Sequence, residues 1–134
     1  MANQVKYQLR KDIFAYLKAS LPTVDVVPEH PTGSGASKPK LVVTLARDQS
    51  TGQFLADRVI SNPEIQLTCY ASKELDLTKP TGLLNRLEEL MLVPQPSWKE
   101  YNYHKIRDTP TFFAQDPLLY CSYFIYRFYT ATNL

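Results

Sequence analysis

The sequence of 134 residues lacks the features that mark a membrane protein or a strong polyanion binder. No apolar run approaches the roughly 18 residues that a membrane-spanning helix requires, so we expect no membrane partner. The N-terminus carries no apolar signal segment, and we therefore expect the protein to be made in the cytoplasm. Basic and acidic residues number 15 and 13, so net charge alone requires no nucleic-acid partner.

Cysteine is also scarce. Cys69 and Cys121 lie in different predicted strands, far from any CxxC arrangement. We expect both to be buried, reduced thiols rather than a disulfide or a reactive pair.

Glycine occurs only four times, and two of the four lie in "HPTGSGASKPK", residues 30–40. A phosphate-binding loop needs its lysine directly after the last glycine and a helix directly after the loop. Here Ala36 and Ser37 separate Gly35 from Lys38, and Pro39 stands where the helix should begin. The segment therefore predicts a mobile loop.

Groups that would converge in an active site are missing. His30 and His104 have no Cys, Asp or His at metal-ligand spacing. Glu88 and Glu89 are adjacent on a predicted helix and face different directions, which indicates a solvated surface. Asp57 and Arg58 predict at most a weak surface ion pair. We expect no enzyme, and no catalytic, cofactor-binding or metal-binding residue.

The clearest pattern that is present is an amphipathic helix over residues 4–21. Its apolar residues recur every three or four positions, with Asn3 as the predicted N-cap and Pro22 as the stop signal. A second helix is predicted from Thr78 as N-cap through the leucine-rich "LLNRLEELML" to Pro94. A chain of this length forms one domain, residues 1–134.

The remaining segments favour strands. We predict strands over residues 23–27, 40–47, 63–72 and 100–108, with a polar turn region at 48–58 and a proline-bounded loop at "PTFFAQDP". In "PEIQLTCYAS" the residues alternate, so that one face is dry and the other, with Glu64, Gln66, Thr68 and Tyr70, is wet.

The last segment, residues 118–132, differs because both of its faces are apolar or aromatic. Tyr120, Phe124, Tyr126 and Phe128 share one face, whereas Cys121, Tyr123, Ile125 and Tyr129 share the other. Two helices cover one face of a sheet of this size but not both. The second face therefore either meets a partner chain or leaves its tyrosines lying on a solvated sheet.

An exposed aromatic sheet face also suits a single-stranded nucleic-acid-binding α+β module, and this alternative stays open. Against it, the chain lacks the K/R-G-F/Y-G/A-F-V-x-F/Y pattern, and "YFIYRFY" has no glycine that would let bases lie on the sheet.

The order of these pieces resembles the tail terminator, or tail-to-head joining (tail completion), proteins of long-tailed siphophages. The likeness lies in the helix ending "YLKASLPTVDVV", the strand "KLVVTLAR", and "DRVISNPEIQLTCYAS" running into "LLNRLEELM". The family likeness implies an α+β fold with a mixed, largely antiparallel sheet and two main helices packed on one face. It also implies a virion protein that forms a ring, typically of six copies, and meets the tail tube protein and the head connector or completion protein.

Together with the residue patterns, this resemblance predicts which residues contact partner proteins. The loops 29–40 and 48–58 are expected to become ordered on meeting a partner. The interface residues expected here are Lys38, Lys40, Arg47, Phe54, Arg58, Tyr123 and Tyr129. The basic ones would meet acidic partner surfaces or DNA passing through the ring.

Overall fold

The computed structural model describes residues 2–27, 39–48, 54–55, 58–96, 98–99, 101–114 and 119–133. The predicted loop residues 29–38, most of the turn region 48–58, and with them His30, Lys38 and Asp57, lie outside the described residues. The chain has an α+β fold, as the resemblance implies, with a mixed and largely antiparallel sheet.

The helices are α1 (Ala2–Ser20), α2 (Glu74–Thr78) and α3 (Leu83–Met91). The strands, in chain order, are β1 (Asp25–Val27), β2 (Lys40–Asp48), β3 (Phe54–Leu55), β4 (Arg58–Ser61), β5 (Pro63–Ala71), β6 (Asn102–Asp108), β7 (Phe112–Ala114) and β8 (Leu119–Asn133). They form one eight-stranded sheet in the order β1-β2-β5-β8-β4-β3, with β6 and β7 also paired to β8. The β1–β2 pair is parallel, and every other pair is antiparallel.

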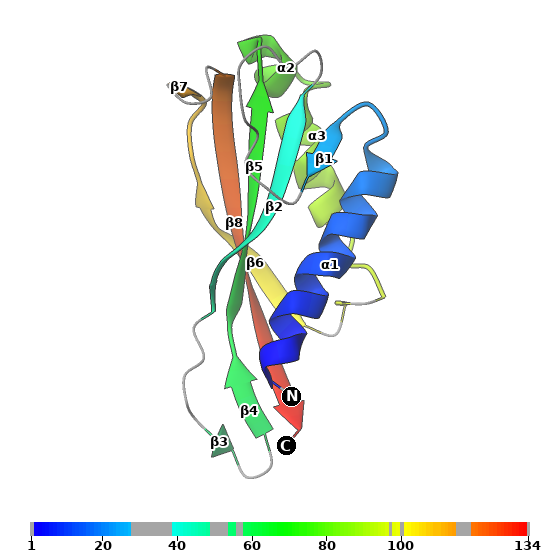
Figure 1. Cartoon of the computed structure of the whole chain (residues 1–134), viewed down its shortest axis with the longest axis vertical. Helices are drawn as coiled ribbons and strands as arrows, with labels where there is room; N and C mark the ends of the chain where they lie inside the picture. Colours follow the sequence, from blue (N-terminus) through cyan, green and yellow to red (C-terminus); the bar gives the residue numbers. More distant parts are fainter. Residues whose placement is uncertain are drawn as a thin grey trace.

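The long strand β8 organises this sheet. On one side it pairs with β5 and then, in the same register, with β4, from Ala71↔Tyr120 through to Arg58↔Asn133. On its other side it pairs with β7 and β6. The end of β8 that carries β4 and β3 extends away from α2, as Figure 1 shows, and forms an arm whose β4 part lies beside the N-terminal end of α1.

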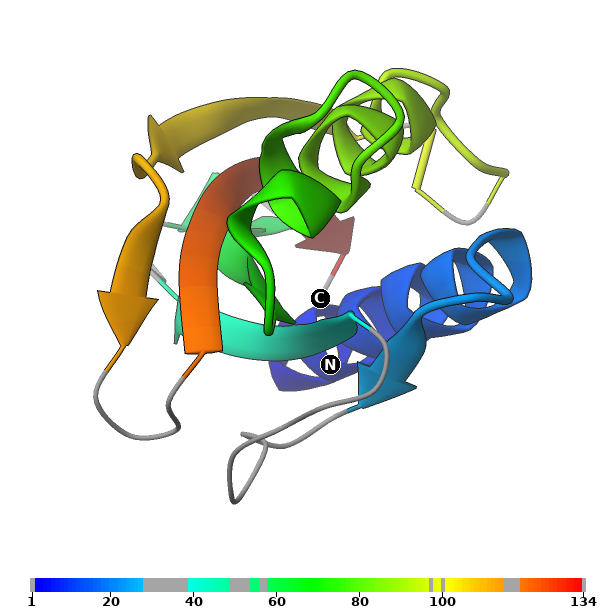
Figure 2. The same cartoon turned by 90° about the horizontal axis from the view of Figure 1, so that it is seen from above.

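Helices α1 and α3 cover one face of the curved sheet, as expected (Figures 1 and 2). The stripe of α1 is buried at four-residue spacing, by Leu9, Ile13 and Leu17, and Leu21 just after the helix continues it. These side chains meet Leu41, Leu67 and Phe128 of the sheet in one core. Burying each large apolar side chain contributes about 2 kcal/mol, which makes this helix–sheet contact the main source of stability.

Two tyrosine hydroxyls fix the C-terminal end of α3. Tyr16 of α1 donates a hydrogen bond to the Leu90 carbonyl (3.1 Å), and Tyr103 of β6 donates one to the Met91 carbonyl (2.6 Å). The last carbonyls of a helix have no partner within it, so these bonds satisfy them and tie α3 to its neighbours. Tyr16 also meets the buried ring of Trp98 edge-on, with the ring centroids 5.5 Å apart.

Several local predictions were wrong. Helix α1 begins at Ala2, so Asn3 lies inside the helix rather than at its N-cap. Thr78 ends α2 rather than beginning the second main helix, whose N-cap is Gly82. The predicted loop "PTFFAQDP" contains strand β7, because β8 supplies a pairing partner that local sequence cannot show.

The prediction that one face of β5 is exposed to solvent is also wrong. Glu64, Thr68 and Tyr70 are buried, and only Gln66 on this face is partly exposed. Tyr70 packs with Val42, Leu119 and Cys121 in a small second cluster on the face opposite the helices. The end of β5 that carries Tyr70 is therefore covered on this face by neighbouring side chains of the sheet.

Gly82 generates a prediction about stability. A Cβ atom here would lie 2.7 Å from the Leu77 carbonyl oxygen and 2.9 Å from that of Lys79, both of them backbone atoms that cannot swing away. Gly82→Ala should therefore lower the free energy of unfolding by about 1–3 kcal/mol, measured by urea denaturation. Thr81→Ala, at an exposed neighbour, is the control. Equal stability of the two variants would contradict this close packing.

Tyr126 generates a prediction about alkaline pH. Burial raises the pKa of Tyr126 from 10.0 to about 12. The unfolded chain loses this proton near pH 10 and the folded chain only near pH 12, so the stabilisation present below pH 10 is lost between these values. The stability of the wild type should therefore fall more steeply above pH 10 than that of Tyr126→Phe. Parallel pH profiles of the two proteins would contradict the assignment.

Candidate interaction surface

The face of the sheet away from the helices is open along the middle of β8. Cys121 at the start of the strand is buried, Tyr123, Ile125 and Arg127 are half-buried, and Tyr129 is 39% exposed. We call the outward face formed by Tyr123, Ile125, Arg127 and Tyr129 of β8, with Glu64 and Gln66 of β5 and His104 of β6, the open face. The sequence predicted that the second face of β8 is uncovered along the whole strand. In the structure the uncovered part of this face runs from Tyr123 to Tyr129.

An ion pair lies at the centre of the open face. The Arg127 side chain donates from Nε (3.1 Å) and Nη2 (2.8 Å) to one carboxylate oxygen of Glu64 on the neighbouring strand. Glu64 is only 6% exposed, so the guanidinium supplies the charge compensation that a buried carboxylate needs. This interaction with Glu64, and a weaker one with Tyr129, raise the pKa of Arg127.

An aromatic pair lies beside this ion pair. The rings of His104 and Tyr129 stack, with centroids 5.4 Å apart and planes 22° apart. His104 also lies opposite Arg127 in the β6–β8 ladder. The result is a platform of flat side chains with a cation beside it, which suits stacking against another protein or against a base.

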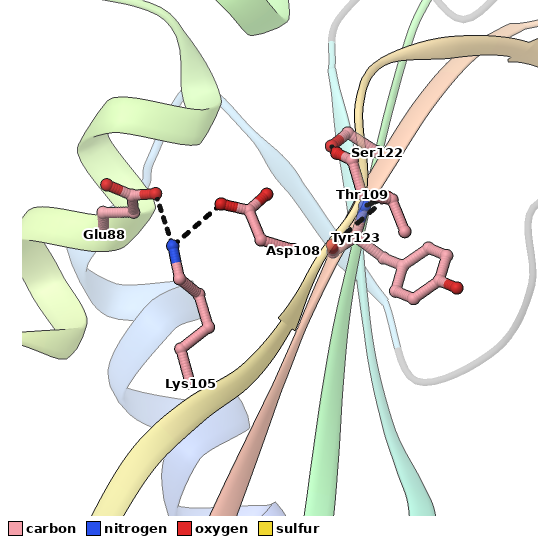
Figure 3. A network of polar contacts seen from close by, with 6 residues as sticks. All are labelled: Glu88, Lys105, Asp108, Thr109, Ser122 and Tyr123. Carbon is pink, nitrogen blue, oxygen red and sulfur yellow. Dashed lines mark hydrogen bonds and ion pairs between the residues drawn. The ribbon is translucent and has the colours of Figure 1, made fainter.

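The opposite side of β6 carries a different polar network, drawn in Figure 3. Lys105 Nζ lies 2.9 Å from a carboxylate oxygen of Glu88 on α3 and 2.9 Å from one of Asp108. Burial by itself would lower the pKa of Lys105, but the hydrogen bonds to Asp108 and Glu88 outweigh it and the pKa is raised. The network ties β6 to α3, so Glu88 is not the purely solvated residue that its position suggested.

Thr109 joins the ends of β6 and β7 to the sheet. Its hydroxyl donates to the Tyr123 carbonyl (3.3 Å) and accepts from the Tyr123 amide (2.9 Å), while Ser122 Oγ donates to the Thr109 carbonyl (2.8 Å; Figure 3). The Thr109 amide also donates to the Tyr123 carbonyl (3.1 Å), so the side-chain bonds add to the backbone pairing just before Pro110.

The predicted interface residues fall into separate groups. Tyr123 and Tyr129 lie together on the open face, and Lys40 begins β2 at a register position on the same face, two rows from Tyr123. Arg47 pairs with Glu64 in the ladder, whereas Phe54 and Arg58 belong to the β3–β4 arm. Lys38 lies outside the described residues.

Sequence reasoning missed Glu64, Arg127 and His104 as members of this face. Glu64 and Arg127 are 63 residues apart, and only the β5–β8 register brings them together. The alternation of β8 already placed Arg127 with Tyr129, but nothing in the sequence identified the strand that lies beside them.

The structure shows no arrangement suited to metal or thiol chemistry among the residues it describes. No group of three or more His, Cys, Asp or Glu side chains in these ranges lies close enough to hold a metal ion. Cys69 and Cys121 are free and buried, as predicted, and burial raises the pKa of both thiols. Within the same described ranges, no helix has the length and apolar character needed to cross a membrane.

The chain matches none of the models of known protein families, and a comparison with curated protein sequences also returns no match.

The Glu64–Arg127 pair generates the prediction for this surface. Arg127→Leu leaves the buried Glu64 carboxylate without its cation, so the free energy of unfolding should fall clearly more than in a control at an exposed arginine. Adding Glu64→Gln should recover part of this loss, because it removes the unpaired charge. Arg107→Leu, at an exposed arginine of the adjacent strand, is the control and should cost little.

Chemical denaturation of these four proteins at neutral pH measures the effect. If Arg127→Leu were no more destabilising than Arg107→Leu, the Glu64–Arg127 ion pair would contribute nothing measurable to the stability of the fold.

Proposed function

We propose that this chain is a structural virion protein of a long-tailed bacteriophage. It would cap the tail tube and join the tail to the head connector, acting by binding other proteins and carrying out no catalysis. The observation that carries the proposal is the open face, where stacked and half-exposed aromatic side chains lie on a sheet that its own helices cover on one side only.

The composition of the open face favours a protein partner. Tyrosine combines a large apolar ring with a polar tip, and aromatic and arginine side chains are enriched in protein interfaces. Arg127 is already paired with Glu64, so the cation at the centre of this face is neutralised within the chain. Phosphate binding needs cations that are available to the ligand, and on this face these are Arg107, opposite Ile125 in the ladder, and Lys40 toward β2. Two separated cations make nucleic acid the less favoured occupant.

The shape of the chain suits a ring. A ring requires each copy to present two different patches, one to each neighbour. The open face and the β3–β4 arm lie on different parts of the sheet, so they provide distinct surfaces for a neighbouring copy and for the tail tube or head proteins. Six copies is the number that the resemblance implies.

The basic residues have a secondary role in this proposal. Lys40, Arg47 and Arg58, together with Lys38 in the loop, would contact acidic surfaces of the head completion protein or the DNA that passes through the ring. The protein would then lie at the head–tail junction of the virion, after assembly in the host cytoplasm.

Electron microscopy of phage lysates lacking this protein tests the proposal. We expect filled heads separate from tails, with tails that are overlong or unattached. Supplying the wild-type protein should restore joined particles. Normal virions in its absence would contradict the proposed function.

A matched pair of variants tests the open face within the same complementation assay. Tyr123→Ser with Tyr129→Ser should reduce joined particles at least tenfold, whereas Tyr7→Ser, at an exposed tyrosine of α1 (56% exposed), should restore them as the wild type does. Titration of the purified chain with single-stranded DNA at two salt concentrations tests the alternative. Tight binding that weakens steeply with salt would favour the nucleic-acid-binding module instead.

A further inference from the structure

A cavity of about 320 Å³ lies on the helix side of the sheet, between the C-terminal half of α3 and strand β6. Its lining combines a carboxylate, an ammonium, two tyrosines and two apolar side chains: Glu88, Lys105, Tyr103, Tyr126, Met91 and Leu92. Small-molecule sites have volumes of about 300–1,000 Å³ and combine apolar walls with a few polar groups. This cavity is at the lower end of that range, so it has room for one small group rather than for a large cofactor.

The Tyr126 hydroxyl is the polar group of this lining that the fold does not use. Tyr126 is only 7% exposed, yet its hydroxyl makes no hydrogen bond with any residue in the described part of the chain. Buried polar groups normally have a partner. The nearby Tyr16 and Tyr103 follow this rule, because both donate to carbonyls at the end of α3. The Tyr126 hydroxyl is therefore available to a ligand in the cavity.

The charges beside the cavity act on this hydroxyl. Burial raises the pKa of Tyr126 to about 12, Lys105 lowers it, and Glu88 and Asp108 raise it. The hydroxyl thus lies within electrostatic reach of all three charges and stays protonated at neutral pH. A protonated phenol oxygen still has lone pairs, so it can accept a hydrogen bond from a ligand.

The balance of these charges favours a cation. Lys105 Nζ lies between the carboxylates of Glu88 and Asp108, 2.9 Å from an oxygen of each (Figure 3), and 4.8 Å from the centre of the Phe124 ring. Two carboxylates around one ammonium leave one negative charge in excess. The second oxygen of Glu88 accepts no hydrogen bond from another residue in the described ranges. An anionic ligand would be repelled here, whereas a cationic one would be attracted.

The shape and polarity of the lining favour a guanidinium over other cations. A guanidinium is planar and weakly hydrated, and its several N–H groups can bond to a carboxylate and a hydroxyl oxygen together. The rings of Tyr103 and Tyr126 add favourable contacts with a delocalised cation. Met91 and Leu92 offer an apolar wall to the methylene stem that such a group carries.

We propose that this cavity binds a guanidinium group on an apolar stem, with Glu88 and Tyr126 accepting its hydrogen bonds. Tyr126 points to the face of β8 that packs against the helices, away from the open face. The inference therefore goes beyond the proposed function and does not depend on it. The group would come either from a small compound or from an arginine of another protein, which would also cover the exposed Leu92 and Val93 beside the cavity (78% and 57% exposed).

Titration of the isotope-labelled full-length chain with butylguanidinium, followed by nuclear magnetic resonance at neutral pH, tests the proposal. We expect saturable shifts in α3 and β6 with a dissociation constant of about 1–10 mM, because a ligand of few atoms gains little free energy. Pentanoate, an anion of similar size, should not bind. Equal binding of pentanoate, or no saturable shift up to about 50 mM butylguanidinium, would overturn the proposal.

Matched variants make the test specific. Glu88→Gln and Tyr126→Phe should each weaken binding about three- to tenfold. Glu89→Gln, which borders a separate hollow between α1 and α3, and Tyr123→Phe, on the open face, should bind as the wild type does. Tyr126→Phe should keep its stability at neutral pH, because the hydroxyl has no partner among the described residues, so its weaker binding would not reflect unfolding. Equal affinity of all four variants would contradict the assignment.

A peptide distinguishes the two sources of the guanidinium. Acetyl-Leu-Arg-Leu-amide should bind at least tenfold more tightly than butylguanidinium if the natural ligand is an arginine of a partner protein, and its lysine counterpart should lose this gain. Equal affinity of the peptide and butylguanidinium would assign the site to a small compound. If phage lacking the protein fail to join heads and tails but butylguanidinium does not bind, only this inference fails. If butylguanidinium binds and phage assemble normally without the protein, only the proposed function fails.

Discussion

The fold depends on the double pairing of β8. This strand is the only described element that hydrogen-bonds to four others, with β5 and β4 along one side and β7 and β6 along the other. Its Phe124, Tyr126 and Phe128 side chains form the floor on which the helices pack. The helices pack against that face, so the opposite face of β8 is the part of the sheet that can meet another molecule.

The open face shows how a polar sheet surface is stabilised without a covering layer. Glu64 is buried by its neighbours on the sheet, and Arg127 neutralises it from the adjacent strand. A buried carboxylate is costly unless it is paired, so this ion pair fixes the side chains around it more than it adds net stability. The stacked His104 and Tyr129 are thereby held in a defined arrangement before any partner arrives. Such preorganisation lowers the entropy cost of binding.

The sequence predicted the elements whose signal is local. The four-residue spacing of the α1 stripe and the alternation of β2, β5 and β8 are properties of short windows, and the strands and helix formed where expected. Features that depend on distant neighbours were missed. β7 exists because β8 pairs with it, and Tyr70 is buried because Leu119 and Cys121 lie beside it. The Thr78 prediction failed because a threonine ahead of a leucine-rich segment resembles an N-cap, whereas here its hydroxyl bonds back to the Glu74 carbonyl at the end of α2. For the interface, alternation placed Tyr123 and Tyr129 on one face, but no local pattern identified Glu64 or His104 as their neighbours.

The central claim, which rests on the proposed function, is that this domain acts by offering the open face to other protein chains. Amide hydrogen exchange, followed as the chain concentration is raised, tests it most directly because exchange reports the covering of individual backbone segments. The account predicts slower exchange at the middle of β8, with the exposed surface of α1 unchanged. Protection that appears only at the helices, or at no segment up to the solubility limit, would contradict it.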